Sequence, residues 1–172
     1  MIHQDISPEL LVFKDDGEFP NSRLPLLIFK EVFAAGPVTP GHIEKVFHQN
    51  NWVNSWRNGL YTFHHYHSTA HEVLGVFSGW VKALLGGPDG DILTAKSGDV
   101  IVVPAGVAHR NVEQSPDFKV VGAYPKGQFP DMQYGKLGER PGVDENIRQV
   151  DLPMSDPVYG KTGPLIKAWH TE

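Results

Sequence analysis

Four of the nine histidines of this chain lie within residues 64–71, directly before Glu72. Imidazole and carboxylate groups are side chains that bind first-row divalent metals. Side chains two positions apart share one face of a β-strand, so His65 and His67 would present both imidazoles on the same side. A further histidine, His109, follows later in the chain. These residue types and spacings predict a metal site built on a β-scaffold.

The composition is that of a globular protein without nucleic-acid-binding or membrane-binding character. The 172 residues suit one structural domain, with 40% hydrophobic and 20% charged residues. A net charge of -5 and scattered Lys and Arg argue against nucleic acid and anionic lipid as partners. We find no apolar run long enough for a membrane span, and no signal-peptide pattern. The absence of cysteine excludes disulfides and thiolate metal sites and leads us to expect a cytoplasmic protein.

The N-terminal third contains one segment with clear helical signals. Thr39 can act as the N-cap and Pro40 occupies the first helical position, so we expect a short helix over residues 40–51. The apolar segment Leu24–Val32 predicts a strand, and Pro25 near its start favours an edge position in a sheet.

From Leu60 the pattern changes to an alternation of period two, which predicts a strand through His67. On this reading Tyr61 and Phe63 share the face of the two histidines, either as core residues or as a pocket wall. Short apolar runs separated by Gly, Pro and Asp turns continue to residue 124 and predict an all-β fold. The Pro- and Gly-rich remainder predicts an irregular tail anchored by Trp169.

Two spaced motifs in this chain resemble those of the cupin superfamily. The first motif is matched at every position and the second at all but its last, where Glu113 replaces an asparagine. The matching residues are Gly59, His65, His67, Glu72 and Gly79, followed by Gly98, Pro104, Gly106 and His109. The segment 65–72 and the tail containing 156–160 are similar in sequence to small single-domain bacterial YjlB-like cupins.

This resemblance implies a jelly-roll barrel, the cupin double-stranded β-helix, as the fold. Residues 59–124 would form the core barrel, residues 1–58 an N-terminal extension of strands and one helix packed on it, and residues 125–172 the tail, all within one structural domain. The resemblance also implies one divalent metal ion inside the barrel, namely Fe, Mn, Ni, Zn or Cu. It further implies a homodimer, for which Leu24–Val32 is a candidate to cover an exposed sheet edge or apolar face.

The implied metal ligands are His65, His67, Glu72 and His109. Such a mixed nitrogen and oxygen set suits several first-row metals, and spacing alone does not select one. His71 is the alternative to Glu72, because a gap one residue shorter would place a histidine at the carboxylate position. Neighbouring residues on a strand face opposite sides, so we expect only one of the two to be a ligand. With Glu72 as ligand, His71 is expected at the surface or behind the ligands.

Two classes of function agree with this reading. The first is a metal-dependent enzyme, an oxygenase, isomerase or lyase acting on a small polar molecule at the metal. The second is a non-catalytic module that binds or senses a small molecule through the metal. Fold does not decide between these classes, and the sequence offers no clear catalytic acid or base.

Overall fold

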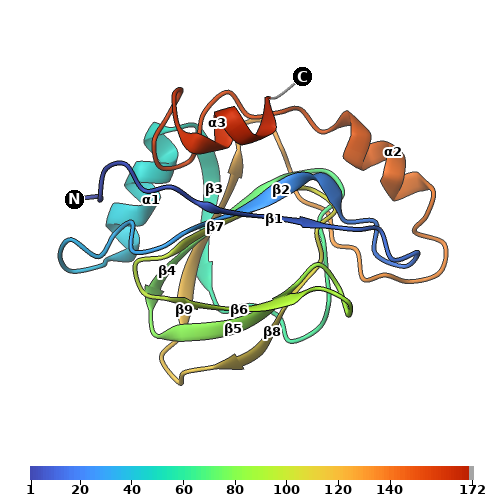
Figure 1. Ribbon diagram of the computed structural model, residues 1–172, viewed down its shortest axis with the longest axis horizontal. Coiled ribbons are helices and arrows are strands. Elements are labelled where there is room, and N and C mark those ends of the chain that lie inside the picture. The colour runs from blue at the N-terminus through green and yellow to red at the C-terminus, as the bar shows by residue number, and fades with distance from the viewer. Residues whose placement is uncertain (171–172) are drawn as a thin grey trace.

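The computed structural model describes residues 1–170 and consists mainly of β-strands (Figure 1). The strands are β1 (Glu9–Phe13), β2 (Ser22–Phe29), β3 (Trp52–Asn58), β4 (Glu72–Ser78), β5 (Trp80–Leu85), β6 (Asp91–Lys96), β7 (Val100–Val103), β8 (His109–Gln114) and β9 (Lys119–Pro125). The helices are α1 (Pro40–Gln49), α2 (Gly142–Gln149) and α3 (Pro164–Trp169). The expected all-β class is therefore confirmed.

The strands form two antiparallel sheets. One has six strands in the order β1-β2-β7-β4-β9-β3, and the other has three in the order β6-β5-β8. Within residues 1–170 no named strand pairs across from one sheet to the other, so the strands do not close into one continuous hydrogen-bonded barrel. β4 lies at the centre of the larger sheet, with Glu72 opposite Val103 of β7 and Val73 opposite Ala123 of β9. The candidate ligand Glu72 is thus the first residue of a buried central strand.

Both faces of the inner strands of the six-stranded sheet are buried, which explains the nearly continuous apolar runs of β4, β7 and β9. In β2, Leu27 and Phe29 pack in the cluster that also contains residues of α1 and α3. Leu26 and Ile28 point the other way, into the cluster shared with β5 and β6 of the smaller sheet. The helices therefore cover one face and the smaller sheet covers the other.

The expected helix at residues 40–51 is confirmed as α1. Thr39 caps it by accepting a hydrogen bond from the backbone N–H of His42 at 3.3 Å. Its apolar residues, including Ile43, face the larger sheet. A Cβ atom at Gly75 would lie 2.8 Å from Cγ2 of Ile43, so the missing side chain allows α1 to lie directly against β4.

Three expectations about the elements are wrong. The segment from Leu60 to His67 is not a regular strand, because His65 bridges to His109 whereas Tyr66 bridges to Gln133, and no single partner extends a ladder. Leu24–Val32 does not provide an edge: β2 lies between β1 and β7. Its proline is tolerated because the β1–β2 register shifts near that position.

The third correction concerns the tail, which is not irregular throughout. It contains α2 and α3, and α3 begins at Pro164, a residue suited to the first helical turn. Trp169 confirms its predicted role as an anchor: it is buried, and its Nε1 donates to the carbonyl oxygen of Pro25 at 2.8 Å. No helix within residues 1–170 combines the length and apolarity that crossing a membrane requires.

Candidate metal centre

Three buried imidazoles meet at one end of the smaller sheet. His65 and His67 come from the segment before β4, and His109 is the first residue of β8. The backbones of His65 and His109 exchange two hydrogen bonds, at 3.2 and 2.9 Å, which fixes the two residues side by side. One nitrogen atom from each ring lies within 4.8 Å of those of the other two. This cluster could hold a metal ion.

Backbone carbonyl groups determine which nitrogen of each ring carries the proton. The Nδ1 atom of His65 lies 3.1 Å from the carbonyl oxygen of Phe63. The Nδ1 atom of His67 lies 2.6 Å from the carbonyl oxygen of Asp131, and that of His109 lies 3.1 Å from the carbonyl oxygen of Val107. A carbonyl oxygen only accepts, so each Nδ1 is the donor, and Nε2 carries a free lone pair whenever the ring is neutral. Hydrogen bonds of this kind, from the ring nitrogen that does not bind the metal, orient metal-binding histidines.

The buried Nε2 atom of His109 has no hydrogen-bond partner within the described chain. A buried polar atom without a partner is costly, and a metal ion would satisfy it. Burial and the neighbouring His109 lower the pKa of His65 to about 3, which keeps the His65 ring neutral near pH 7. A neutral imidazole is the form that binds a metal. The residues present therefore fit a divalent metal ion.

The carboxylate of Glu72 lies against this cluster. Its Oε2 is 3.3 Å from Nε2 of His67, and its Oε1 is 3.4 Å from Nε2 of His109. Burial favours the neutral carboxyl form, but the two imidazoles outweigh burial and hold the pKa of Glu72 below its usual range. Burial likewise opposes protonation of His67, but the Glu72 carboxylate raises the pKa of His67 to about 9. The site thus attracts positive charge, which a proton or a metal ion can supply.

His71 lies away from the cluster, on the side of β4 that faces α3. Its ring is 4.7 Å from that of Trp169, and its Nδ1 accepts a hydrogen bond from the backbone N–H of Ala105 at 2.9 Å. Of the two positions expected for His71, at the surface or behind the ligands, the surface one is wrong, since only 2% of the residue is exposed. The structure therefore brings Glu72, and not His71, to the three imidazoles.

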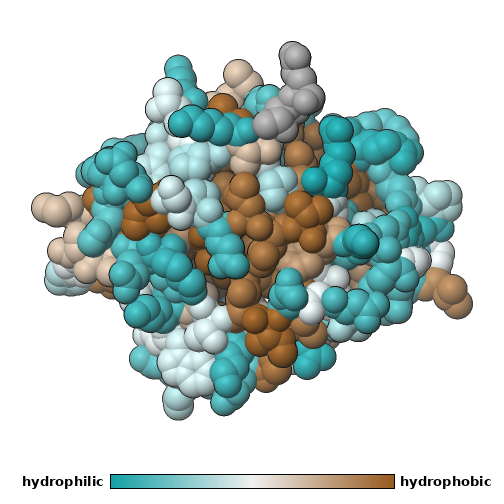
Figure 2. All heavy atoms as spheres, viewed as in Figure 1, coloured by the Kyte–Doolittle hydropathy of each residue, from teal (hydrophilic) through white to brown (hydrophobic). Residues whose placement is uncertain are grey.

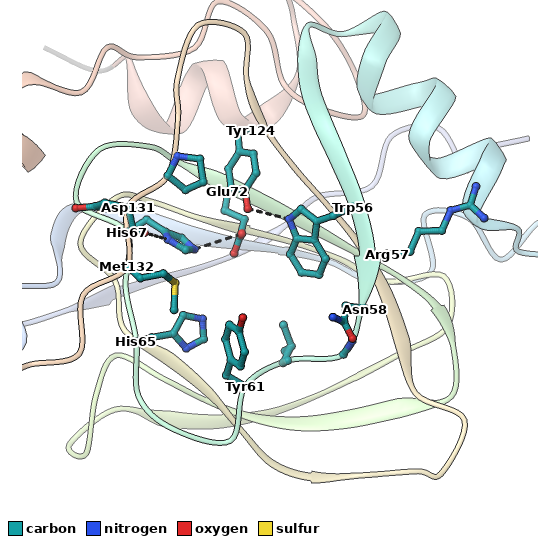
Figure 3. A pocket seen from close by; sticks show the side chains of 13 residues that line it. Trp56, Arg57, Asn58, Tyr61, His65, His67, Glu72, Tyr124, Asp131 and Met132 are labelled. Carbon is teal, nitrogen blue, oxygen red and sulfur yellow. Dashed lines mark hydrogen bonds and ion pairs between the residues drawn. The ribbon is translucent and has the colours of Figure 1, made fainter.

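A cavity of about 450 Å³ opens beside the imidazoles (Figure 3). Tyr61, Trp56 and Tyr124 line it together with His65, His67 and Glu72. The indole Nε1 of Trp56 donates to the hydroxyl oxygen of Tyr124 at 2.8 Å. The prediction that Tyr61 and Phe63 are core residues is wrong. They are 56% and 43% exposed, and their rings stack on each other with centroids 4.8 Å apart. Of this pair, Tyr61 forms part of the cavity wall.

Comparison with known proteins gives the family of this chain. No family model matches. The uncharacterised protein YjlB of Bacillus subtilis (strain 168) is 40% identical over 158 residues, which cover 91% of this chain and 93% of YjlB. The chain belongs to the YjlB family.

Solved structures resemble this member of the YjlB family only weakly. A DUF861 family protein from Thermotoga maritima is 20% identical, with a TM-score of 0.33 over 53% of this chain and 94% of that chain. Procruciferin, an 11S globulin from Brassica napus, is 13% identical, with a TM-score of 0.38 over 86% of this chain and 36% of that chain. At these TM-scores the likeness carries no argument about function.

Sequence reasoning missed the contribution of the segment after β9. Asp131 and Met132 line the cavity, and the backbone carbonyl of Asp131 orients His67. The Asp131 carboxylate accepts hydrogen bonds from the backbone N–H of Ser68 at 2.6 Å, from the Ser68 hydroxyl, and from Nε2 of Gln133 at 3.0 Å. Asp131 lies 22 residues after His109, the last matched motif position, and neither the type nor the spacing of these residues signals the role.

Proposed function

We propose that this member of the YjlB family binds one divalent first-row metal ion, Fe, Mn, Ni, Zn or Cu, through His65, His67 and His109, with Glu72 as the fourth ligand. The observation that carries the proposal is the convergence of three Nε2 lone pairs whose Nδ1 atoms are all committed to backbone carbonyls. The carboxylate within 3.4 Å of two of these nitrogen atoms supports a mixed nitrogen and oxygen set.

We also infer that the two sheets form the cupin double-stranded β-helix. They enclose a shared apolar cluster, and two of the motif glycines, Gly79 and Gly106, occupy positions that a side chain would disrupt. Gly79 has φ +65°, and a Cβ there would lie 2.2 Å from Oγ of Ser115; Gly106 has φ +97°, and its Cβ would meet the carbonyl oxygen of Asn21 at 2.3 Å. The spacing of both motif glycines thus reflects backbone geometry around the site.

The centre is suited to a small molecule and not to a purely structural metal. Four protein ligands close a tetrahedral structural zinc site, whereas an ion that accepts about five or six ligands would keep one or two positions open beside these four. The cavity reaches the side chains of His65, His67 and Glu72, so a molecule in it would meet the open positions. When bound, the ion supplies Lewis acidity or redox chemistry of the kind used in oxygenase, isomerase and lyase reactions.

The protein's own groups prepare this site in two ways. The carbonyl groups of Phe63, Asp131 and Val107 hold the rings in the tautomer that leaves Nε2 free. The hydroxyl of Tyr124 accepts from Trp56, so its own proton is free to be donated to Glu72 or to a molecule in the cavity. Burial raises the pKa of Tyr124, which keeps this hydroxyl protonated.

Elemental analysis of the purified protein tests the proposal. Protein produced in medium supplemented with each metal should carry close to one ion per chain. The His65→Ala/His109→Ala double variant should lose it, whereas the exposed control His48→Ala should retain it. Protein that stays metal-free and does not rebind any of the five metals would refute the proposal.

Turnover separates the enzyme from the alternative, a non-catalytic metal-dependent binding or sensing module. Both would bind a small molecule at the same place. Oxygen uptake and product analysis with candidate substrates on metal-loaded protein should show consumption for an enzyme, whereas saturable binding without consumption would indicate a sensing module.

A further inference from the structure

We propose that the cavity selects small molecules that carry a single metal-binding polar head of at most one negative charge on a flat, aromatic or otherwise apolar body. This inference rests on the proposed function, because the head would bind the metal at the three imidazoles. The cavity, about 450 Å³ in volume, is of the size that accepts one small molecule. The aromatic residues that line the cavity and the charges around it identify the class of ligand.

The first wall is the indole of Trp56, and the fold builds it in advance. Trp56 of β3 lies opposite Gly122 of β9, and a Cβ at Gly122 would lie 2.2 Å from the indole ring. The absence of a side chain therefore lets the indole lie against the backbone of β9. The hydrogen bond from Nε1 to the hydroxyl of Tyr124 fixes the ring from its edge. These two contacts hold Trp56 at the cavity (Figure 3).

A second aromatic wall comes from a different segment. Tyr61 lies before the histidines and meets the ring of His65 edge-on, with centroids 5.3 Å apart. Its other neighbour is Phe63, on which it stacks. Met132, also in the lining, adds a polarisable thioether. Aromatic rings favour planar apolar partners in offset or edge-on contact, so these walls suit a flat body more than a sugar or a polyol.

The charges around the cavity limit the ligand to one anionic group. Arg57 is the only cationic Lys or Arg side chain among the described lining residues, and Figure 3 shows it turned away from the cavity toward α1. There its Nε donates to Oε1 of Glu44 at 2.6 Å. The Asp131 carboxylate is taken up by Ser68 and Gln133, so Glu72 is the carboxylate beside the imidazoles. Glu72 and one anionic head on the ligand would together balance the charge of a divalent ion. A second carboxylate or a phosphate on the ligand would then be desolvated without a cationic partner among the described lining residues, which is unfavourable.

The affinities of three hydroxamates, which share one metal-binding head and differ in the group attached to it, test this inference. The protein is loaded with Co²⁺, whose visible absorption reports both the metal and each added probe. Benzohydroxamate should bind at least tenfold more tightly than acetohydroxamate, which lacks the ring. It should also bind at least tenfold more tightly than 4-carboxybenzohydroxamate, which adds a second negative charge. These three measurements use the native chain and need no variant.

Variants of Trp56 then test whether the aromatic wall of the cavity causes the preference for benzohydroxamate. Trp56→Leu should reduce the preference for benzohydroxamate over acetohydroxamate at least threefold, whereas Trp56→Phe should largely retain the preference. Phe129→Leu is the matched control, since Phe129 is an exposed aromatic residue outside the lining. Equal affinities of the three probes for Co²⁺-loaded protein would overturn this inference while leaving the metal centre intact. Failure to bind Co²⁺ or any of the five metals named above would overturn the proposed function and this inference with it.

Discussion

The backbone carbonyl of Asp131 accepts a hydrogen bond from Nδ1 of His67 at 2.6 Å, although the two residues are 64 positions apart. The Asp131 side chain holds this carbonyl in place through Ser68, the residue directly after His67. One aspartate of the C-terminal segment thus fixes both the tautomer and the orientation of a candidate metal ligand. The C-terminal segment therefore helps to build the candidate metal centre.

Replacing Asp131 with alanine should weaken metal binding without removing a ligand. The Ser68 contacts are lost, the carbonyl is free to shift, and His67 loses its fixed orientation. Loss of such an outer partner lowers metal affinity by about 10- to 100-fold. Calorimetric titration with Zn²⁺ would measure the change, with the exposed residue Asp151 as the matched control in Asp151→Ala. Equal affinities in the two variants would show that the carbonyl needs no such support.

Glu72→Gln should mainly lower the metal affinity, whereas His71→Ala should mainly lower the free energy of unfolding. Glu72→Gln keeps the shape but removes the charge beside two imidazoles, so metal affinity should fall at least tenfold. His71→Ala should leave metal affinity nearly unchanged and lower the free energy of unfolding by about 2 kcal/mol, because a buried ring is lost and the N–H of Ala105 loses its acceptor. The same metal titration and urea unfolding of both variants decide the matter. A greater loss of affinity in His71→Ala would reverse the ligand assignment.

Stabilisation by the metal should fade as the pH falls. A ligand that binds only the folded state stabilises it by RT ln(1 + [L]/Kd), and imidazole must be deprotonated to bind. Glu72 raises the pKa of His67 to about 9, so at both pH values the metal must displace a proton from this ring. That proton competes about 100-fold more strongly at pH 5.5 than at pH 7.5. Melting curves with and without chelator should differ clearly at pH 7.5 and much less at pH 5.5. Equal chelator effects at the two pH values would argue against imidazole ligands.

Asp156→Ala should destabilise the C-terminal segment. This fully buried carboxylate accepts backbone N–H groups of Val158 at 2.8 Å, Tyr159 at 3.0 Å and Leu165 at 3.0 Å, which orders the turn leading into α3. Three donors left without an acceptor should cost about 2–4 kcal/mol of the free energy of unfolding. Urea denaturation would measure this, with the exposed turn residue Asp89 in Asp89→Ala as control.

We expect a homodimer, now with β1 rather than β2 as the contact. β1 ends the larger sheet, and its outward residues Leu10 and Val12 are 49% and 62% exposed. Figure 2 shows apolar side chains gathered near the middle of the face that β1 crosses in Figure 1. Light scattering at micromolar concentration should give twice the chain mass of 19.1 kDa. Leu10→Asp/Val12→Asp should shift the mass toward the monomer, and a native monomer would contradict the expectation.

Local chemistry in the sequence was enough to predict the strand-rich class, α1 and the candidate ligands. The Thr39–Pro40 cap and the helical spacing of Ile43 and Phe47 act within one or two turns, so their outcome is readable from nearby residues. The two spaced motifs likewise record local backbone demands, such as the positive φ of Gly79. Alternation along the chain also predicted that Glu72 and His71 would face opposite sides.

Only the tertiary structure decided which distant groups complete the site. Asp131 reaches His67 from the C-terminal segment, and Trp56 reaches the cavity because Gly122 of a neighbouring strand leaves room for its indole. The segment from Leu60 to His67 has the alternation of a strand but exchanges hydrogen bonds with two separate partners, so it forms bridges instead. Hydrogen bonding and packing between residues far apart in the chain depend on how the sheets stack, and a pattern of period two contains no information about that arrangement.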